Sequence, residues 1–134
     1  MIGDGMSTPQ VYAAMLTSEN PTSFERFPIT GLVKTYSKSH KITDSAAGGT
    51  AIATGHKTNN GMIGMNSDSI PVPSVLETLS EKGMKTGVVA TSYITHATPA
   101  SFVAKNINRN NYEEIAMDFA KTDKVNILIG GGKK

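Results

Sequence analysis

Residues 43–51 read Thr-Asp-Ser-Ala-Ala-Gly-Gly-Thr-Ala, which joins a helix-start signal to a run of very small residues. Asp44 and Ser45 are both favourable N-cap residues, so a helix is predicted from here through Thr54, ending at Gly55. The unpaired N–H groups and the helix dipole favour an anion beside the Ser45 hydroxyl. In the alternative interpretation, Asp44 or Ser45 only caps the helix, and the alanines allow close packing against a sheet.

The composition describes a domain-sized chain without a dominant charge. Its 134 residues correspond to about one domain. The net charge of +2 is too balanced to indicate a nucleic acid or an anionic membrane as partner. There is no cysteine, so any metal must use oxygen and imidazole ligands. No apolar run approaches the roughly 18 residues of a membrane span, and no signal segment precedes the first motif.

The first residues combine strand, turn and helix signals. Residues 1–6, Met-Ile-Gly-Asp-Gly-Met, are typical of the end of a buried strand followed by a turn, and we expect sequence upstream of them. Such a position faces the ligand crevice of an open α/β sheet, so Asp4 is a candidate metal ligand. The alternative is an ordinary turn aspartate. A helix is predicted over 7–19, and a partly exposed strand over 30–37.

The remaining pattern alternates helices and strands. We predict a short helix over 74–83 and a buried strand over 86–91, then a helix over 112–120 and a buried strand over 125–129. Asn60-Gly61 is expected to close a hairpin. This order of helix, glycine and strand is typical of an α/β fold.

Two further clusters contain residues suited to chemistry. His96 and Thr98 lie two positions apart between a predicted strand and a proline, and in extended chain they point the same way. The alternatives are a hydrogen-bonded loop histidine and a threonine N-cap. Arg109 lies within the asparagine-rich segment 108–111, where a guanidinium can hold two phosphate oxygens. The alternative is a surface arginine.

Together, the motifs at residues 3–6, 43–51, 96–100 and 108–110 closely resemble alkaline phosphatase, and they occur in the matching order. The resemblance spans nearly the whole chain but corresponds only to the front portion of these longer enzymes. It implies an α/β fold, as part of a three-layer α/β/α sandwich with a mostly parallel central sheet, here truncated. Residues 1–134 would be the N-terminal part of a single catalytic domain.

The resemblance implies roles for six residues. Ser45 resembles the nucleophile that becomes phosphoserine, Arg109 the arginine that binds phosphate, and Asp44 the aspartate that steadies this arginine. On this view the small residues after Ser45 leave room for metals and phosphate. Asp4, Thr98 and His96 resemble residues that bind or approach the metal ions.

Two Zn²⁺ and one Mg²⁺ are the cofactors that the resemblance implies. Asp4 resembles the carboxylate shared between a zinc and the magnesium, Ser45 would meet zinc, and Thr98 resembles a magnesium ligand. The family varies between aspartate and histidine at the position of His96, and histidine suggests contact with magnesium through water. The remaining ligands are expected beyond Lys134, so we expect the 134-residue chain to be inactive by itself.

The activity implied is hydrolysis of small phosphate monoesters through a phosphoserine intermediate, in an exported protein that as a full-length enzyme can form a homodimer. One alternative is a related metal-dependent sulfatase or phosphodiesterase. Another is a serine hydrolase using Ser45, His96 and an aspartate, although no Gly-x-Ser-x-Gly elbow is present. The last is a non-catalytic α/β scaffold that binds phosphate through Ser45 amides and Arg109.

Overall fold

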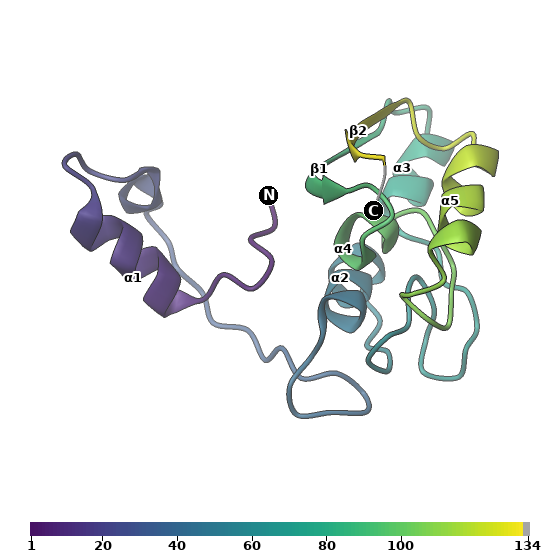
Figure 1. The fold of residues 1–134 in the computed structure, drawn as a ribbon, viewed down its shortest axis with the longest axis horizontal. Coiled ribbons are helices and arrows are strands. Elements are labelled where there is room, and N and C mark those ends of the chain that lie inside the picture. The colour runs from purple at the N-terminus through teal and green to yellow at the C-terminus, as the bar shows by residue number, and fades with distance from the viewer. Residues whose placement is uncertain (133–134) are drawn as a thin grey trace. The chain divides into compact units, whose positions relative to one another are not determined.

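The computed structural model describes residues 1–132 and divides into two compact units, Met1–Lys34 and a second unit that begins at Thr35. The first unit contains helix α1 (Thr8–Thr17) and the short 3-10 helix η1 (Ser23–Arg26). All other helices and strands belong to the second unit (Figure 1). Each unit is described by itself.

Helix α1 begins after Ser7, whose backbone N–H donates to Gln10 Oε1 at 3.1 Å. The predicted helix is therefore present, although it ends at Thr17. The strands predicted at residues 1–3 and 30–37 are wrong, because both segments are irregular. A strand needs a neighbour for its N–H and C=O groups, and neither described strand pairs with these segments.

Helix α2 (Ser45–Thr54) has the limits that the sequence predicts. Asp44 is its N-cap, and Asp44 Oδ1 accepts a hydrogen bond from the Ala47 N–H at 2.9 Å. Gly55 ends the helix in the left-handed conformation, with φ of 76°. Of the two candidate caps, the structure therefore uses Asp44 and leaves Ser45 as the first helical residue.

The small residues of α2 pack against another helix, α4 (Ala97–Ala100). A Cβ on Gly49 would lie 2.8 Å from Ser101 Oγ and 3.4 Å from the Thr98 Cα, so only glycine allows this approach. Ser101 is fully buried and donates to the Ala97 carbonyl at 2.7 Å. Gly49 thus allows close packing against α4, while the role of the small residues in leaving room for metals and phosphate stays a prediction.

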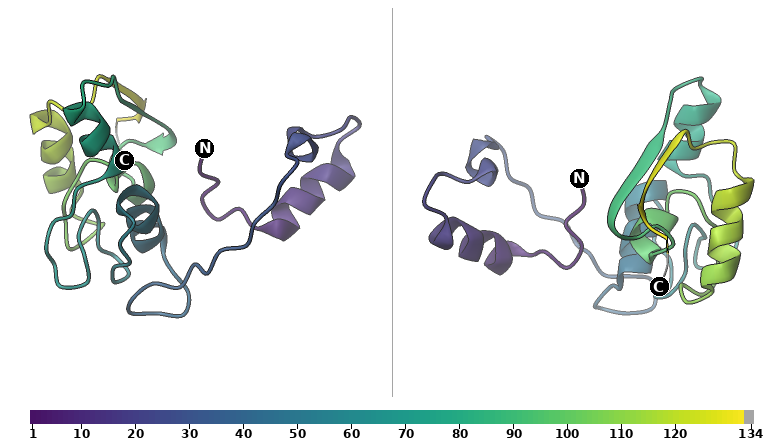
Figure 2. Two further views of the ribbon diagram at one scale, coloured as in Figure 1. Left: turned by 180° about the vertical axis from the view of Figure 1, so that it is seen from behind. Right: turned by 45° about the horizontal axis from the view of Figure 1, so that its top comes forward.

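Helix α3 (Val75–Glu81) and helix α5 (Tyr112–Lys121) accompany a two-stranded sheet of β1 (Gly87–Tyr93) and β2 (Ile127–Gly131). The strands are parallel and lie side by side in Figure 2, with Gly87 opposite Ile127 and Val89 opposite Ile129. Parallel strands need a crossover, which α4 and α5 provide. The α/β class is confirmed.

One core lies between these elements in the second unit. Its buried members are mostly small or branched apolar residues: Ala46, Ile63, Leu76, Val88, Ala97, Ala100, Val103, Ala104, Ile115 and Phe119. Of the two strands only Val88 reaches this core, whereas Val89 is 70% exposed and every residue of β2 is exposed. The prediction of two buried strands is therefore wrong for the described residues, because a buried parallel sheet needs cover on both faces.

The hairpin predicted at Asn60-Gly61 is also wrong. A turn does form there, with φ of 89° at Gly61, but the chain that follows does not pair with the chain before the turn. Ile63 instead pairs antiparallel with Asn106, through N–H to carbonyl bonds of 2.8 and 2.9 Å. The turn therefore directs the chain toward a segment distant in sequence.

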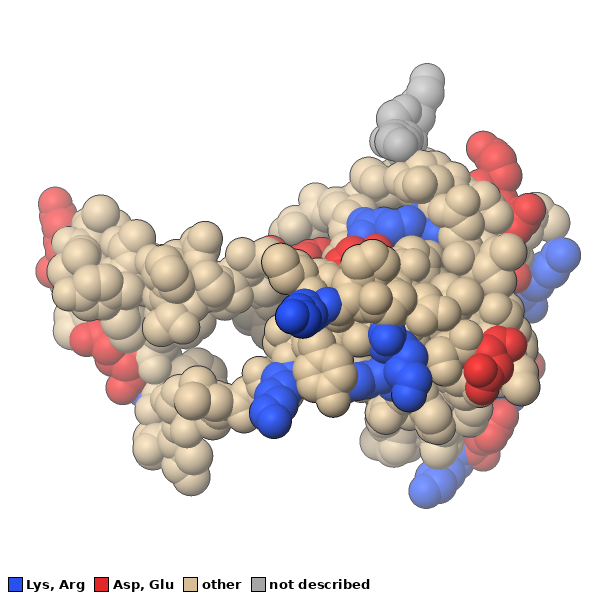
Figure 3. All heavy atoms as spheres, turned by 90° about the horizontal axis from the view of Figure 1, so that it is seen from below, with Lys and Arg blue, Asp and Glu red and all other residues tan. Residues whose placement is uncertain are grey.

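On the face shown in Figure 3, blue and red side chains are spread over a mostly uncharged surface, and in places they lie against each other. This agrees with the small net charge. The helices formed by residues 1–132 all fall short of the length and hydropathy that a membrane-spanning segment requires.

The contact between α2 and α4 predicts that Gly49→Ala destabilises the protein. Overpacking costs about 1–3 kcal/mol, and the better helix propensity of alanine offsets about 1 kcal/mol. Gly48→Ala is the matched control, because its Cβ would meet Thr43 at an ordinary 3.6 Å. Chemical denaturation should show a lower free energy of unfolding for Gly49→Ala than for Gly48→Ala. Equal stability of the two variants would contradict the packing argument.

Candidate active site

An ion pair between two segments that lie 65 residues apart forms the centre of the candidate site. Arg109 Nη1 donates to Asp44 Oδ2 at 3.0 Å. Each side chain is only 25% exposed, so Arg109 is held in place and is not a free surface arginine. Asp44 thus caps α2 with one carboxylate oxygen and holds the guanidinium with the other.

Ser45 directly follows this carboxylate as the first residue of α2. Its side chain is half-buried, and its hydroxyl makes no hydrogen bond to any residue in the described part of the chain. Because Asp44 caps the helix, the Ser45 hydroxyl is not needed as a cap. A nearby hydroxyl at a helix N-terminus suits attack on an anionic group, which the dipole and the N–H groups attract.

His96 lies beside the second terminal nitrogen of the guanidinium. Arg109 Nη2 is 3.4 Å from His96 Nε2. His96 itself is extended, with φ of −60° and ψ of 148°, and it takes the N-cap position of α4. The N-cap predicted as an alternative for Thr98 is therefore wrong, because Thr98 lies inside the first turn of α4. The shared extended conformation predicted for His96 and Thr98 is wrong for the same reason.

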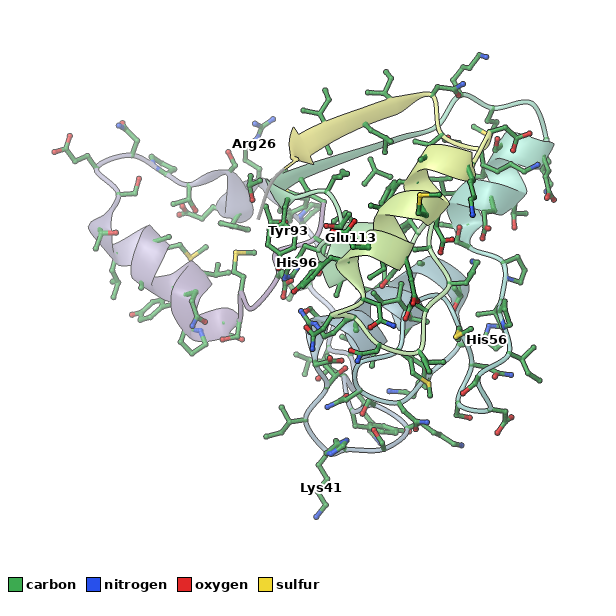
Figure 4. The ribbon with its side chains drawn as sticks, turned by 45° about the vertical axis from the view of Figure 1, so that its right-hand side comes forward. Arg26, Lys41, His56, Tyr93, His96 and Glu113 are labelled. Atoms are coloured by element: carbon green, nitrogen blue, oxygen red, sulfur yellow. The ribbon has the colours of Figure 1, made fainter. Side chains whose placement is uncertain are left out.

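Two tyrosines support the His96 ring. The Tyr93 ring meets the His96 ring edge to face, with centroids 5.4 Å apart, and the two side chains lie together in Figure 4. The Tyr93 and Tyr112 hydroxyls share a hydrogen bond of 3.2 Å. This bond raises the pKa of the Tyr93 hydroxyl above its ordinary value, and desolvation adds to the rise, while the Arg109 charge lowers it.

Sequence reasoning missed four residues that contact the site. Tyr93 and Tyr112 lie at the end of β1 and the start of α5, and no local pattern brings them together. Gly61 accepts the Arg109 backbone N–H at 2.8 Å, and Asn60 Oδ1 accepts the Asp44 N–H at 3.2 Å. The Asn60-Gly61 pair predicts a turn, but the residues of a turn do not indicate which distant residues the turn will contact.

Asp4 belongs to the first unit, where it is exposed on a turn. The Met6 N–H donates to the Gly3 carbonyl at 3.2 Å, and Gly5 has φ of 70°. These features are those of the turn alternative. A role of Asp4 as a metal ligand stays a prediction.

The donors available for metals are mainly oxygens. Asp4, Ser45 and Thr98 offer a carboxylate and two hydroxyls, which suit Mg²⁺ better than Zn²⁺. Within residues 1–132, no group of three or more His, Cys, Asp or Glu side chains is placed to hold a metal ion. The described residues therefore do not fit a complete zinc site by themselves.

Comparison with known proteins gives a consistent result. The family model described as "Alkaline phosphatase" matches residues 1–134. Alkaline phosphatase 4 of Bacillus subtilis (strain 168) is 45% identical and aligns with 99% of this chain. The chain spans only 32% of that relative, or about one third of its length.

Solved structures agree with the sequence comparison. A variant of TAB5 alkaline phosphatase, solved with Mg bound in the site named M3, is 43% identical and has a TM-score of 0.93. The alignment covers 96% of this chain and 37% of that one. The cold-active alkaline phosphatase of a psychrophilic Shewanella sp. has a TM-score of 0.92 at 38% identity, covering 99% of this chain and 35% of that one.

The hydrogen bond between Tyr93 and Tyr112 leads to a prediction about the pKa of the Tyr93 hydroxyl. In Tyr112→Phe the shared hydrogen bond is lost, so the pKa of Tyr93 should fall toward its ordinary value, and Tyr93 should ionise at lower pH. The stability contributed by the raised pKa is present below the ordinary tyrosine pKa and is lost as pH rises through the raised value. Ultraviolet absorbance of tyrosinate during a pH titration measures the change.

Tyr93→Phe identifies which part of the absorbance belongs to Tyr93. Tyr12→Phe is the control, because Tyr12 is 60% exposed and lies in the first unit. An unchanged Tyr93 titration in Tyr112→Phe would show that the hydrogen bond is not the main cause of the raised pKa.

Proposed function

Because this chain belongs to the alkaline phosphatase family, we propose that the protein containing it hydrolyses phosphate monoesters. The observation that carries the proposal is the Asp44–Arg109 ion pair beside the first residue of α2. This arrangement places a hydroxyl, a guanidinium and a helix N-terminus in one region. Each of these groups favours binding or transfer of a phosphoryl group.

Ser45 is the proposed nucleophile. Its hydroxyl oxygen forms a bond to phosphorus while the bond from phosphorus to the leaving oxygen breaks. The serine loses its proton to solvent, and the leaving oxygen takes up a proton from solvent and departs as the alcohol. Water then cleaves the phosphoserine, which restores Ser45 and yields inorganic phosphate. Asp44 caps α2 through Oδ1, so the helix cap does not require the Ser45 hydroxyl.

Arg109 is proposed to hold the phosphate oxygens. A guanidinium carries five N–H donors. One of them is directed at Asp44 Oδ2, and another nitrogen lies 3.4 Å from His96. The remaining donors are available to an anion, and donors fixed before the reaction stabilise developing charge most effectively.

The proposed cofactors are two Zn²⁺ and one Mg²⁺. Within the second unit, Thr98 would contribute an oxygen to the magnesium, His96 would contact it through water, and Ser45 would contribute to zinc, while a metal-binding role of Asp4 stays a prediction. When bound, such ions stabilise charge on the phosphoryl and leaving oxygens and lower the pKa of a hydroxyl. Because residues 1–132 hold no zinc cluster, we propose that further ligands come from sequence beyond Lys134.

Corresponding proposals apply to the whole protein. Its substrates would be small phosphate monoesters, it would be exported, and it would assemble as a homodimer; residues 1–134 would form the N-terminal part of one catalytic domain. The serine hydrolase alternative has no support in the described residues. There the His96 ring contacts Arg109 and Tyr93, and Ser45 makes no hydrogen bond to it.

The direct test of the function is Ser45→Ala in the whole protein. We expect loss of the phosphoserine intermediate, while slow hydrolysis by direct attack of water on the ester remains. Quenching at low pH with labelled substrate measures the phosphoenzyme. Ser80→Ala is the control, since Ser80 is also a half-buried helical serine without a side-chain hydrogen bond in the described residues. Labelled phosphate on the Ser45→Ala protein would refute the assignment.

A second prediction concerns the 134-residue chain by itself. It should not hydrolyse p-nitrophenyl phosphate at a meaningful rate even with zinc and magnesium present, because hydroxyl and carboxylate donors alone hold zinc weakly. Turnover and the zinc content after dialysis are the measurements, with the whole protein as reference. Near-parental turnover with about two zinc ions retained per chain, as a two-metal site requires, would show that the chain contains its own ligands.

A further inference from the structure

The turn at Asn60 and Gly61 contacts both partners of the central ion pair. Asn60 Oδ1 accepts the Asp44 backbone N–H at 3.2 Å, and the Gly61 N–H donates to Asp44 Oδ2 at 3.0 Å. The Gly61 carbonyl accepts the Arg109 backbone N–H at 2.8 Å. Two adjacent residues thus tie together segments that are far apart in the sequence.

The turn is itself held on both sides. The Asn60 backbone N–H donates to the Ser39 hydroxyl oxygen at 3.0 Å, and Asn60 Nδ2 donates to the Ile42 carbonyl at 3.1 Å. Beyond the turn, Ile63 is fixed by its antiparallel bridge to Asn106. Gly61 has φ of 89°, a conformation that favours glycine. The turn is therefore a fixed part of the structure from which other groups can be positioned.

The hydrogen bonds leave the Asp44 carboxylate little freedom. Oδ1 accepts the Ala47 N–H, and Oδ2 accepts both the Gly61 N–H and Arg109 Nη1. The direction in which Oδ2 meets the guanidinium is thus set by Gly61. At the same time the Gly61 carbonyl fixes the backbone from which the Arg109 side chain extends.

From this geometry we propose that Asn60 and Gly61 are positioning residues that aim the Arg109 guanidinium at the phosphate. The inference rests on the proposed phosphatase function. Neither residue carries charge or a reactive group, so their effect passes through Asp44 and Arg109. Losing the Asn60 acceptor frees the Asp44 backbone, and the guanidinium then samples orientations that hold only one phosphate oxygen at a time.

A double-mutant cycle in the whole protein tests the proposal, using Asn60→Ala, Arg109→Ala and the combined variant. The measurements are inhibition by inorganic phosphate, and KM separately from kcat. Asn60→Ala removes two side-chain hydrogen bonds, of which one reaches Asp44. Loss of that one bond should weaken phosphate inhibition by roughly three- to tenfold. In the Arg109→Ala background the Asn60→Ala substitution should change phosphate inhibition by less than about twofold, because the guanidinium that Asn60 positions is absent.

Asn66→Ala is the matched control. Asn66 Oδ1 also holds a turn, by accepting the Asp68 and Ile70 N–H groups at 3.0 Å, and it makes no hydrogen bond to Asp44 or Arg109. The Asn66→Ala substitution should leave phosphate inhibition unchanged. Thermal unfolding of every variant separates lost stability from lost positioning. If Asn60→Ala does not fold, Asn60→Ser replaces it, because serine keeps a shorter acceptor. Asn60→Ser should weaken phosphate inhibition by less than is expected for Asn60→Ala.

The outcomes separate the positioning role of Asn60 and Gly61 from the phosphate-binding role of Arg109. If Asn60→Ala weakens phosphate inhibition equally with and without Arg109, the turn does not act through the guanidinium and the positioning role is overturned. An unchanged phosphate inhibition in Asn60→Ala also overturns it. If Arg109→Ala itself leaves phosphate inhibition unchanged, the proposed phosphate-binding role of Arg109 fails, and the positioning role fails with it.

Discussion

The Asp44 carboxylate is the group on which the site depends. A helix begins with N–H groups that have no intrahelical partner, and Asp44 satisfies one of these through Oδ1. Its second oxygen then remains to accept from Gly61 and from Arg109. A capping serine or threonine has one side-chain oxygen and no charge, and so cannot both cap the helix and form an ion pair. The requirement for a helix cap thereby places a fixed negative charge beside Ser45.

That negative charge also limits what the site can bind. A lone carboxylate would repel a phosphate, so Asp44 is compatible with an anion only because Arg109 neutralises it. The pair is partly exposed, and its contribution to folding stability is accordingly small. Its value lies in orientation, since the guanidinium keeps donors free while two fixed segments restrain it. Stabilising a doubly charged phosphate would require more positive charge, which agrees with the proposed metal ions.

Close packing between α2 and α4 determines which residues surround this pair. Gly49 lets the α4 backbone approach α2 closely, and His96 lies at the start of α4. The same approach that buries Ala46, Ala97 and Ala100 therefore brings His96 beside the Arg109 guanidinium. Tyr93 then supports the imidazole from the end of β1. Gly49 and the buried alanines thus pack the two helices together, and the site lies at the end of that contact.

The sequence by itself determined the features that arise from neighbouring residues. Local hydrogen bonding and backbone freedom determine the limits of α2, with its cap at Asp44 or Ser45 and its end at Gly55. They also determine the alternation of helix and strand. The four motifs also identified the family. Only the tertiary structure decided that Asn60 and Gly61 join Asp44 to Arg109 instead of closing a hairpin. It also decided that Tyr93 meets Tyr112, and that the β2 strand stays exposed. These contacts join residues far apart in the chain, and no local rule for turns or strands specifies which distant group will supply the partner for a hydrogen bond or the cover for an apolar face.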